Sequence, residues 1–151
     1  MAIPKSIRRL LHPTDFSRAS RPAFAKALEL ARDAGADLVL LHVRSLAVPM
    51  LGEGYIAPQT YEEIERSSRA AAAKQMNRLV EEAKKRGVRA RGVLGEGVPH
   101  EQIVRTARSQ KADMIVMGTH GRTGVSKLFL GSVAGKVVSL ASCPVLTVRG
   151  K

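Results

Sequence analysis

The stretch that most constrains how this chain can fold is residues 38–43, whose side chains are all apolar except that of His42. A strand that is apolar on both faces is typical of a parallel sheet with helices on both sides. Residues 88–94 alternate between apolar and polar side chains, which predicts a strand nearer the edge of the sheet. Further short apolar runs predict strands at 7–12, 112–117 and 144–148.

Apolar residues at helical spacing occupy the segments between these strands. The first predicted helix follows Ser20, which can cap it, and ends at Gly35. The longest is expected over residues 61–86, and two more begin at Pro99 and near Ser132. The core-facing stripe expected on the longest helix consists of Ile64, Ala72, Met76, Leu79 and Ala83.

Alternating strands and helices predict a single-domain α/β chain, with a parallel sheet of five strands and helices on both faces. The length of 151 residues suits one domain, so we expect residues 1–151 to form one unit. In such sheets ligands bind beyond the carboxyl ends of the strands. Four residues at or just beyond those ends are expected to face one crevice, namely Asp15, Val43, Gly95 and Gly118.

The glycine pattern Gly118-x2-Gly121-x9-Gly131-Ser132 joins the fourth predicted strand to the last helix. Glycine lets the backbone approach a ligand without a Cβ, and a helix start offers N–H groups to an anion. Arg122 adds a positive charge for a phosphate. The structural alternative is that the glycines only permit a tight connection. Together with Arg122 and Ser132, the pattern favours phosphate binding.

The net charge of +12, from 25 basic and 13 acidic residues, raises the question of an anionic partner. A nucleotide or nucleic acid would account for it, and so would a solubilising surface; both stay open. The basic residues are scattered, and aromatic residues make up only 3%, which argues against a stacking platform for single-stranded nucleic acid. With no apolar run long enough to span a membrane and no signal peptide, the expected location is cytoplasmic.

Several single features have both a functional and a structural interpretation. Residues 44–59 form a predicted loop, either a surface connection or a lid or subunit contact. His12 and His42 end adjacent strands without a carboxylate or cysteine at ligand spacing, so structural roles are favoured over a metal pair. His120 either contacts phosphate or faces solvent. Cys143 is expected to be a small buried hydrophobic residue.

Several catalytic motifs are missing from the sequence. Residues 118–127 contain neither Gly-x4-Gly-Lys-[Ser/Thr] nor Gly-x-Gly-x-x-Gly in register after a first strand, which argues against a P-loop and a dinucleotide site. There is no Gly-x-Ser-x-Gly nucleophile elbow. No general base can be placed beside a γ-phosphate, so rapid phosphoryl transfer lacks support.

Four motifs occur in order along the chain: PTDFS at 13–17, HV at 42–43, the glycine pattern from Gly118 to Ser132, and CPVLTV at 143–148. Together they resemble the universal stress protein family (UspA-like) over essentially the whole chain. The glycine spacing is similar to that of the ATP-binding subgroup. Two features depart from the family pattern, which are Gly135 in the last helix and the strong positive charge.

The resemblance implies a Rossmann-like open twisted parallel sheet of strand order 3-2-1-4-5. It also implies a homodimer paired through the last strand, Val145–Val148. It implies that Asp15 contacts the adenosine part of ATP and that the backbone at Val43 meets the adenine edge. Mg²⁺ or Mn²⁺ would lie on the phosphates rather than on protein ligands. The residues expected to hold the nucleotide are Pro13, Thr14, Asp15, Val43, Gly118, His120, Gly121, Arg122, Gly131, Ser132 and Val133.

The function that these features favour is an ATP-binding universal stress protein, a nucleotide-dependent regulator in the stress response with at most slow hydrolysis. It is expected to act by population shift rather than as an efficient enzyme. One alternative is a slow ATPase or adenylate-transferring enzyme on the same fold. A second is a basic nucleic-acid-binding module driven by the net charge of +12.

Overall fold

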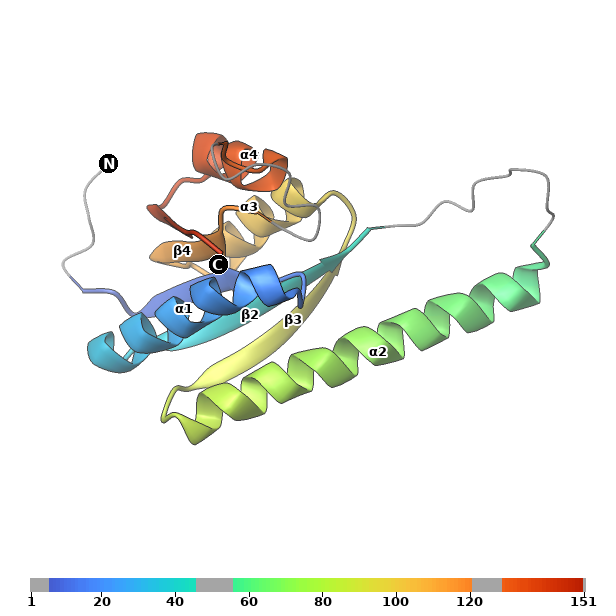
Figure 1. Ribbon diagram of the computed structural model, residues 1–151, viewed down its shortest axis with the longest axis horizontal. Helices are drawn as coiled ribbons and strands as arrows, with labels where there is room; N and C mark the ends of the chain where they lie inside the picture. Colours follow the sequence, from blue (N-terminus) through green and yellow to red (C-terminus); the bar gives the residue numbers. More distant parts are fainter. Residues whose placement is uncertain (1–5, 46–55, 121–128, 151) are drawn as a thin grey trace.

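A five-stranded parallel sheet forms the centre of the computed structural model, which describes residues 6–45, 56–120 and 129–150 (Figure 1). Its strand order is β3-β2-β1-β4-β5, and every neighbouring pair is parallel. The predicted α/β class and the order 3-2-1-4-5 are therefore confirmed. The strands are β1 (Arg9–Pro13), β2 (Asp37–Arg44), β3 (Ala90–Glu96), β4 (Met114–Gly118) and β5 (Val145–Val148).

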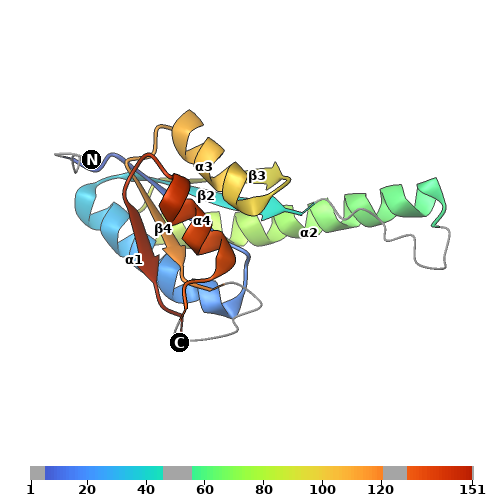
Figure 2. The same ribbon diagram turned by 90° about the horizontal axis from the view of Figure 1, so that it is seen from above.

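Four α-helices cover the two faces of this sheet, as Figures 1 and 2 show. Their side chains form two buried clusters, one between α1 and α2 and the sheet, the other beneath α3 and α4. None of the described helices combines the length and apolar content that a membrane span requires. The helices are α1 (Arg21–Ala34), α2 (Pro58–Lys85), α3 (Pro99–Ser109) and α4 (Ser132–Leu140), and a short 3₁₀ helix (Arg18–Ser20) precedes α1.

Strand β2 explains why the sheet needs helices on both faces. Leu38 and Leu40 are fully buried in the cluster under α1 and α2, whereas Val39 and Leu41 are buried in the opposite cluster. Successive side chains of a strand point to opposite faces, so an all-apolar strand must be covered twice. Its pairing with β1 ends at Leu41, and its last three residues pair with β3 and carry Val43 to the rim of the sheet.

Helix α2 is longer than the sheet it covers. Its 28 residues correspond to about 42 Å, and Figures 1 and 2 show its amino-terminal part extending past the strands. Ala72, Met76 and Ala83 are buried as predicted, and Leu79 packs against the same cluster. The prediction for Ile64 is wrong, because its side chain is 53% exposed.

We expect Ile64→Ser to change the free energy of unfolding by no more than about 0.5 kcal/mol, because exposed substitutions away from special features have small effects. Urea unfolding followed by circular dichroism would measure it. Leu79→Ser, on the packed part of the same helix, is the control and should cost clearly more. A loss above about 1 kcal/mol for Ile64→Ser would show that this side chain is buried in solution.

Several predicted boundaries shift in the structure. The predicted turn at 95–97 is wrong in part, because Gly95 and Glu96 still pair with β2 and only Gly97, with φ +126°, leaves the strand. The predicted loop 44–59 is shorter, because Arg44 belongs to β2 and α2 already begins at Pro58. Residues 46–55 lie outside the described part of the chain, so a lid or subunit contact there remains a prediction.

Candidate functional site

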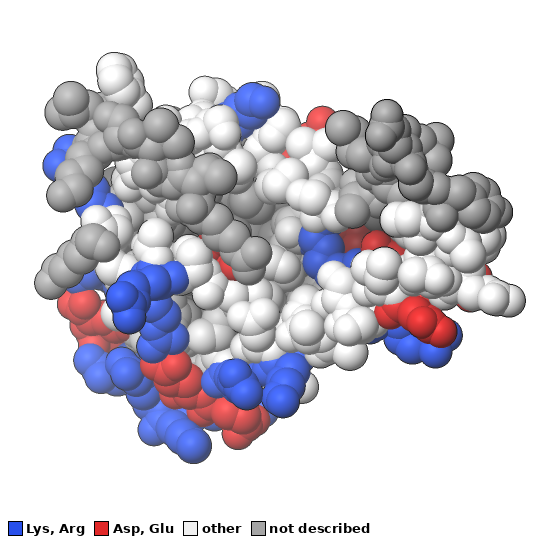
Figure 3. All heavy atoms as spheres, turned by 45° about the vertical axis from the view of Figure 1, so that its right-hand side comes forward, with Lys and Arg blue, Asp and Glu red and all other residues white. Residues whose placement is uncertain are grey.

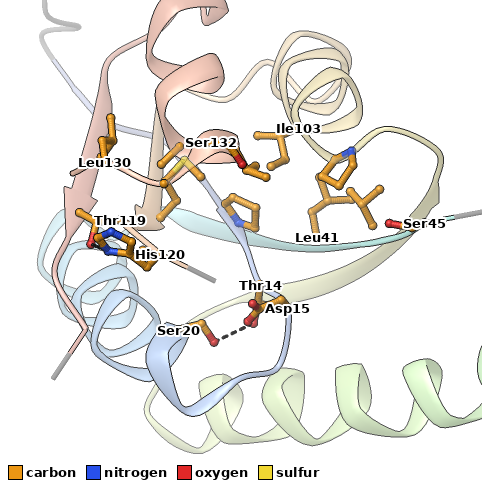
Figure 4. Close-up of a pocket in the computed structure, with 18 of the residues that line it drawn as sticks. Thr14, Asp15, Ser20, Leu41, Ser45, Ile103, Thr119, His120, Leu130 and Ser132 are labelled. Carbon is orange, nitrogen blue, oxygen red and sulfur yellow. Dashed lines mark hydrogen bonds between the residues drawn. The ribbon is translucent and has the colours of Figure 1, made fainter. Parts of the chain in front are cut away.

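A cavity of about 750 Å³ opens at the carboxyl ends of β1, β2 and β4, where α4 begins. This volume falls within the usual range of small-molecule sites, about 300–1,000 Å³. Figure 4 shows side chains from β1, β2, β4, α3 and α4 converging on it. Its lining comprises Pro13, Thr14, Asp15, Ser20, Leu41, Val43, Ser45, Pro99, Ile103, Met117, Gly118, Thr119, His120, Phe129, Leu130, Gly131, Ser132, Val133 and Ala134.

The structure brings together every predicted site residue that it describes. These nine are Pro13, Thr14, Asp15, Val43, Gly118, His120, Gly131, Ser132 and Val133. Gly121 and Arg122 were also predicted, and both lie outside the described residues.

The expectation that Gly95 faces the same crevice is wrong. It lies on β3, one strand beyond β2, and a Cβ there would approach Leu41 and the Gln102 side chain of α3 instead. Pro99 and Ile103, at the start of α3, line that side of the cavity.

The loop after β1 is held in place by its own side chains. The Thr14 backbone N–H donates to the Leu41 carbonyl over 2.8 Å, which fixes the loop to β2. Thr14 Oγ1 accepts the Phe16 N–H at 3.0 Å and lies 3.2 Å from Ser20 Oγ, the contact dashed in Figure 4. Ser20 precedes α1 but makes no side-chain capping bond; its hydroxyl donates to the Ser17 carbonyl at 2.8 Å. Ser20 therefore occupies the predicted N-cap position, but its side chain does not make the predicted capping bond, and it lines the cavity.

Asp15 combines a turn contact with a position on the cavity wall. Its Oδ1 accepts the Ser17 N–H at 2.9 Å, a local turn contact that serves the structural interpretation. Its side chain also lines the cavity, on the wall opposite Ser132 in Figure 4. The contact to Ser17 fixes the rotamer of Asp15, so the carboxylate is held in place before any ligand arrives.

His42 supports this loop from β2. Its Nδ1–H donates to the Thr14 carbonyl at 2.8 Å, and its ring lies 4.2 Å from the ring of Phe16, centroid to centroid. Phe16 has φ +61°, a left-handed conformation that costs a bulky residue free energy. The structural role predicted for His42 is confirmed.

The opposite wall is built where the backbone after β4 meets the start of α4. The Thr119 N–H donates to the Val148 carbonyl at 3.0 Å, and the Gly131 N–H donates to the Thr119 carbonyl at 2.8 Å. A Cβ on Gly131 would lie 2.7 Å from that carbonyl oxygen, closer than atoms can pack. Glycine at 131 is thus required by this close approach.

Helix α4 begins directly after this contact, and its first three residues, Ser132, Val133 and Ala134, line the cavity. The first N–H groups of a helix have no acceptor within it, and the helix dipole adds partial positive charge there. The helix is nine residues long. This wall therefore suits an anionic group such as a phosphate.

The described lining carries little formal charge. It includes the carboxylate of Asp15 and the imidazole of His120, but neither lysine nor arginine. His120 lies at the cavity with its Nδ1 3.0 Å from Thr119 Oγ1. Attraction for an anion therefore comes, within the described residues, from the backbone of α4, and Arg122 remains the predicted side-chain contribution.

An ion-pair network fastens the end of β2, which carries Val43 and Ser45 into the cavity wall. The Arg44 side chain is only 8% exposed and bonds Glu65 of α2 at 2.7 Å and Glu96 of β3 at 3.1 Å. Its carbonyl accepts the Gly97 N–H at 3.0 Å. Because Arg44 is buried, loss of both carboxylates would leave its charge unpaired at considerable cost.

His12 and Cys143 lie apart from the cavity lining. Burial lowers the pKa of His12 to about 4, and its Nδ1–H donates to the Val116 carbonyl at 2.8 Å. Partial burial raises the pKa of the Cys143 thiol, which packs at the edge of the cluster under α3 and α4 and is less buried than predicted. Among the residues with described positions, no group of three His, Cys, Asp or Glu side chains could hold a metal ion.

The residues that sequence reasoning missed come mainly from outside the motifs. Pro99 and Ile103 were placed in a helix, and nothing local indicated that the start of this helix lies at the cavity. The chain order did offer one signal for these two residues. Helix α3 follows the carboxyl end of β3, and ligands bind beyond the carboxyl ends of such strands. The other missed residues are Ser20, Leu41, Ser45, Met117, Thr119, Phe129, Leu130 and Ala134.

Comparison with known proteins places this fold and cavity in a family. Universal stress protein MJ0531 of Methanocaldococcus jannaschii is 35% identical over 145 residues, covering 94% of this chain and 82% of the relative. The structure of MJ0577 from the same organism has a TM-score of 0.83 at 28% identity, covering 96% of this chain and 97% of the other.

A universal stress protein solved in complex with cAMP shares the fold, with a TM-score of 0.70, 21% identity and coverage of 97% and 100%. The model of the Universal stress protein family matches residues 6–149. The chain therefore belongs to the universal stress protein family.

Proposed function

We propose that this chain binds ATP in the cavity between the loop after β1 and the start of α4. One observation carries the proposal. Nine residues chosen from sequence motifs, far apart along the chain, line a single cavity at the carboxyl ends of the strands. The related fold solved with cAMP supports an adenine nucleotide as the ligand.

The geometry supports binding of the adenine base and of the phosphates at opposite ends of the cavity. Val43 and Asp15 lie on the side of β1 and β2, where adenine and ribose would bind. Gly131, Ser132 and Val133 lie at the start of α4, where free N–H groups suit phosphates, and Gly118 ends β4 on the same cavity. Pro13, Thr14 and His120 also line the cavity, and Gly121 and Arg122 are proposed to contact the ribose and phosphates.

The cavity fits a nucleotide that brings its own metal ion. The described residues hold no cluster of metal ligands, so Mg²⁺ or Mn²⁺ would be carried by the phosphates. When bound, the ion neutralises phosphate charge. The chain's own residues hold and orient the nucleotide, and Asp15 already accepts the Ser17 N–H. We therefore propose at most slow hydrolysis.

A binding protein of this kind acts by population shift: ATP favours whichever conformation closes the cavity. We propose a cytoplasmic stress regulator made of one domain over residues 1–151. We also propose a homodimer through β5 (Val145–Val148). Support comes from the position of β5 at the edge of the sheet and from Leu146, which is 37% exposed.

The first test of the proposal is mass spectrometry of small molecules released from the purified, denatured protein, which should detect ATP or ADP. Asp15→Ala should release at least tenfold less, because the variant loses a positioned wall residue. Asp15→Asn is the matched control, since its side-chain oxygen still accepts the Ser17 N–H. Equal release from all three proteins would contradict the assigned site.

Measuring turnover of ATP with Mg²⁺ distinguishes the enzyme alternative, a slow ATPase or adenylate-transferring enzyme, from a binding protein. ATP hydrolysis or adenylate transfer by the wild type well above the rate of Asp15→Ala would show that the cavity catalyses the reaction. Equal background rates, with nucleotide released only from the wild type, would support a binding protein.

A further inference from the structure

The net charge of +12 is not explained by the cavity, whose described lining contains neither lysine nor arginine. Many basic residues instead lie at the opposite end of the sheet, where the strands begin and α2 and α3 end. We call this surface the basic edge. It consists of Arg8, Arg9, Lys84, Lys85, Arg86, Arg89, Arg91, Arg108 and Lys111.

Hydrogen bonds show that part of the basic edge is one continuous surface. Arg9 and Arg91 both bond Gln110, Arg9 at its carbonyl over 2.6 Å and Arg91 at its side-chain oxygen. Arg89 donates to Asp37 at 2.6 Å, and Arg9 lies 3.8 Å from the same carboxylate. Three arginines from β1, β3 and the turn before β3 are thus held side by side.

The acidic residues nearby do not neutralise this surface. Asp37 is shared between Arg9 and Arg89, and Asp113 accepts the backbone N–H groups of Arg8 and Arg9 at 2.8 and 2.9 Å. Glu81 pairs with Lys84 and Glu82 with Arg86, so these two basic residues are neutralised. Four exposed basic side chains of the edge form no ion pair with a described residue, namely Arg8, Lys85, Arg108 and Lys111. Figure 3 shows basic side chains, with acidic ones among them, gathered at its lower left, the side on which α1 and α2 end in Figure 1.

Helix dipoles account for only part of this charge. Basic side chains are favoured at helix carboxyl ends, which explains Lys84, Lys85 and Arg108 in the last turns of α2 and α3. Arg8, Arg89 and Arg91 lie at the beginnings of strands instead, where no such dipole exists. A charged ligand is the explanation that covers both groups.

The chemistry of the edge favours phosphates on a duplex. Arginine binds phosphate through a planar fork of donors. The amino ends of β3, β2, β1 and β4 span about 14 Å at the usual strand spacing. That length of duplex axis carries about eight phosphate charges, of which about four face the protein.

Other anionic partners fit less well. Proteins bind single strands largely through aromatic side chains that stack on the bases, and aromatic residues make up only 3% of this sequence. Peripheral membrane binding combines charge with an apolar anchor. The large exposed apolar residues of the described chain lie elsewhere: Ile56, Ile64, Leu94, Val98, Phe129, Leu130, Val138, Leu140 and Leu146.

We propose that the basic edge binds the phosphate backbone of duplex nucleic acid without reading its sequence. This surface lies at the opposite end of the sheet from the nucleotide cavity, so the proposal does not rest on the proposed function. With about four phosphates contacted, the logarithm of the binding constant falls with the logarithm of salt at a slope of about −3.6. The dissociation constant should therefore rise about 150-fold between 50 and 200 mM salt.

Fluorescence anisotropy with a labelled 20-base-pair duplex of arbitrary sequence tests the proposal, using the full-length chain. The triple variant Arg8→Gln, Lys85→Gln, Arg108→Gln removes three exposed charges of the edge. It is expected to weaken binding at least tenfold and to reduce the salt slope by about 3. The control triple variant, Arg66→Gln, Lys74→Gln, Lys136→Gln, removes the same charge from exposed positions on α2 and α4 and should stay within about threefold of the wild type.

Urea unfolding midpoints within error of the wild type would establish that both triple variants are folded. Equal weakening by the two triple variants would overturn the proposal, because net charge alone would then explain binding. Absence of saturable binding by the wild type at 50 mM salt would overturn it too. So would equal competition by polyglutamate of the same charge, or tighter binding to phosphatidylglycerol vesicles than to duplex.

Discussion

Gly131→Ala is expected to lower the free energy of unfolding by about 1–3 kcal/mol, the usual cost of inserting a methyl group into a packed site. The added Cβ would lie 2.7 Å from the Thr119 carbonyl oxygen. That oxygen cannot withdraw freely, because it accepts the Gly131 N–H and Thr119 itself donates to Val148. The substitution should therefore push the start of α4 away from the cavity. Chemical denaturation measures the stability loss, and nucleotide affinity should fall at least tenfold.

Gly135→Ala is the matched control on the same helix. A Cβ at 135 would meet only Leu130 Cδ2, at 4.0 Å, which is ordinary contact. Replacing glycine within a helix by alanine should raise stability by about 0.5–1 kcal/mol. Opposite signs at 131 and 135 are expected. Destabilisation of similar size at both positions would show that the contact with Thr119 is not the cause.

The folded state should lose about 3 kcal/mol of stability as the pH falls from about 6.5 to 4, because of His12. Burial lowers the pKa of His12 in the folded protein from the unperturbed 6.5 to about 4. Between these values the unfolded chain binds a proton that the folded chain does not, so protonation favours unfolding. Above about pH 6.5 both states hold neutral imidazole, and this contribution is constant. Urea unfolding at closely spaced pH values measures the loss.

His12→Asn isolates this contribution. The asparagine side-chain N–H can replace Nδ1–H as donor to the Val116 carbonyl, and it does not titrate. The variant should lose the pH dependence between 6.5 and 4, whatever its stability at neutral pH. The hydrogen bond from Arg21 lowers the pKa of Glu82, so the stabilisation by Glu82 is lost only as the pH falls below its ordinary value of 4.5. Equal slopes for wild type and variant would show that His12 titrates normally.

The fold was predictable because its signals are local. Apolar side chains on both faces of residues 38–43 require a covered parallel strand, and the structure buries Leu38 to Leu41 in two clusters. Ile64 shows where such reasoning stops. Its position fits the helical stripe, yet its side chain is 53% exposed, because periodicity carries no information on which turns of a helix the sheet covers.

The residues that line the cavity were predictable where they belong to sequence motifs, and less so elsewhere. Strand ends gave Asp15, Val43 and Gly118, since parallel strands place their carboxyl ends on one edge. Ile103 reaches the cavity through the packing of α3 on the sheet, which no local pattern encodes. Gly131 was predicted for its approach to a ligand, whereas its contact with Thr119 depends on a partner twelve residues earlier.

The central claim is that this cavity binds ATP, and calorimetric unfolding of the wild-type protein with increasing ATP and Mg²⁺ tests it most directly. ATP at about 100 times its dissociation constant should add about 2.7 kcal/mol to the free energy of unfolding, and the melting temperature should rise steadily with concentration. A melting temperature that neither ATP nor ADP changes at millimolar concentration would contradict the claim.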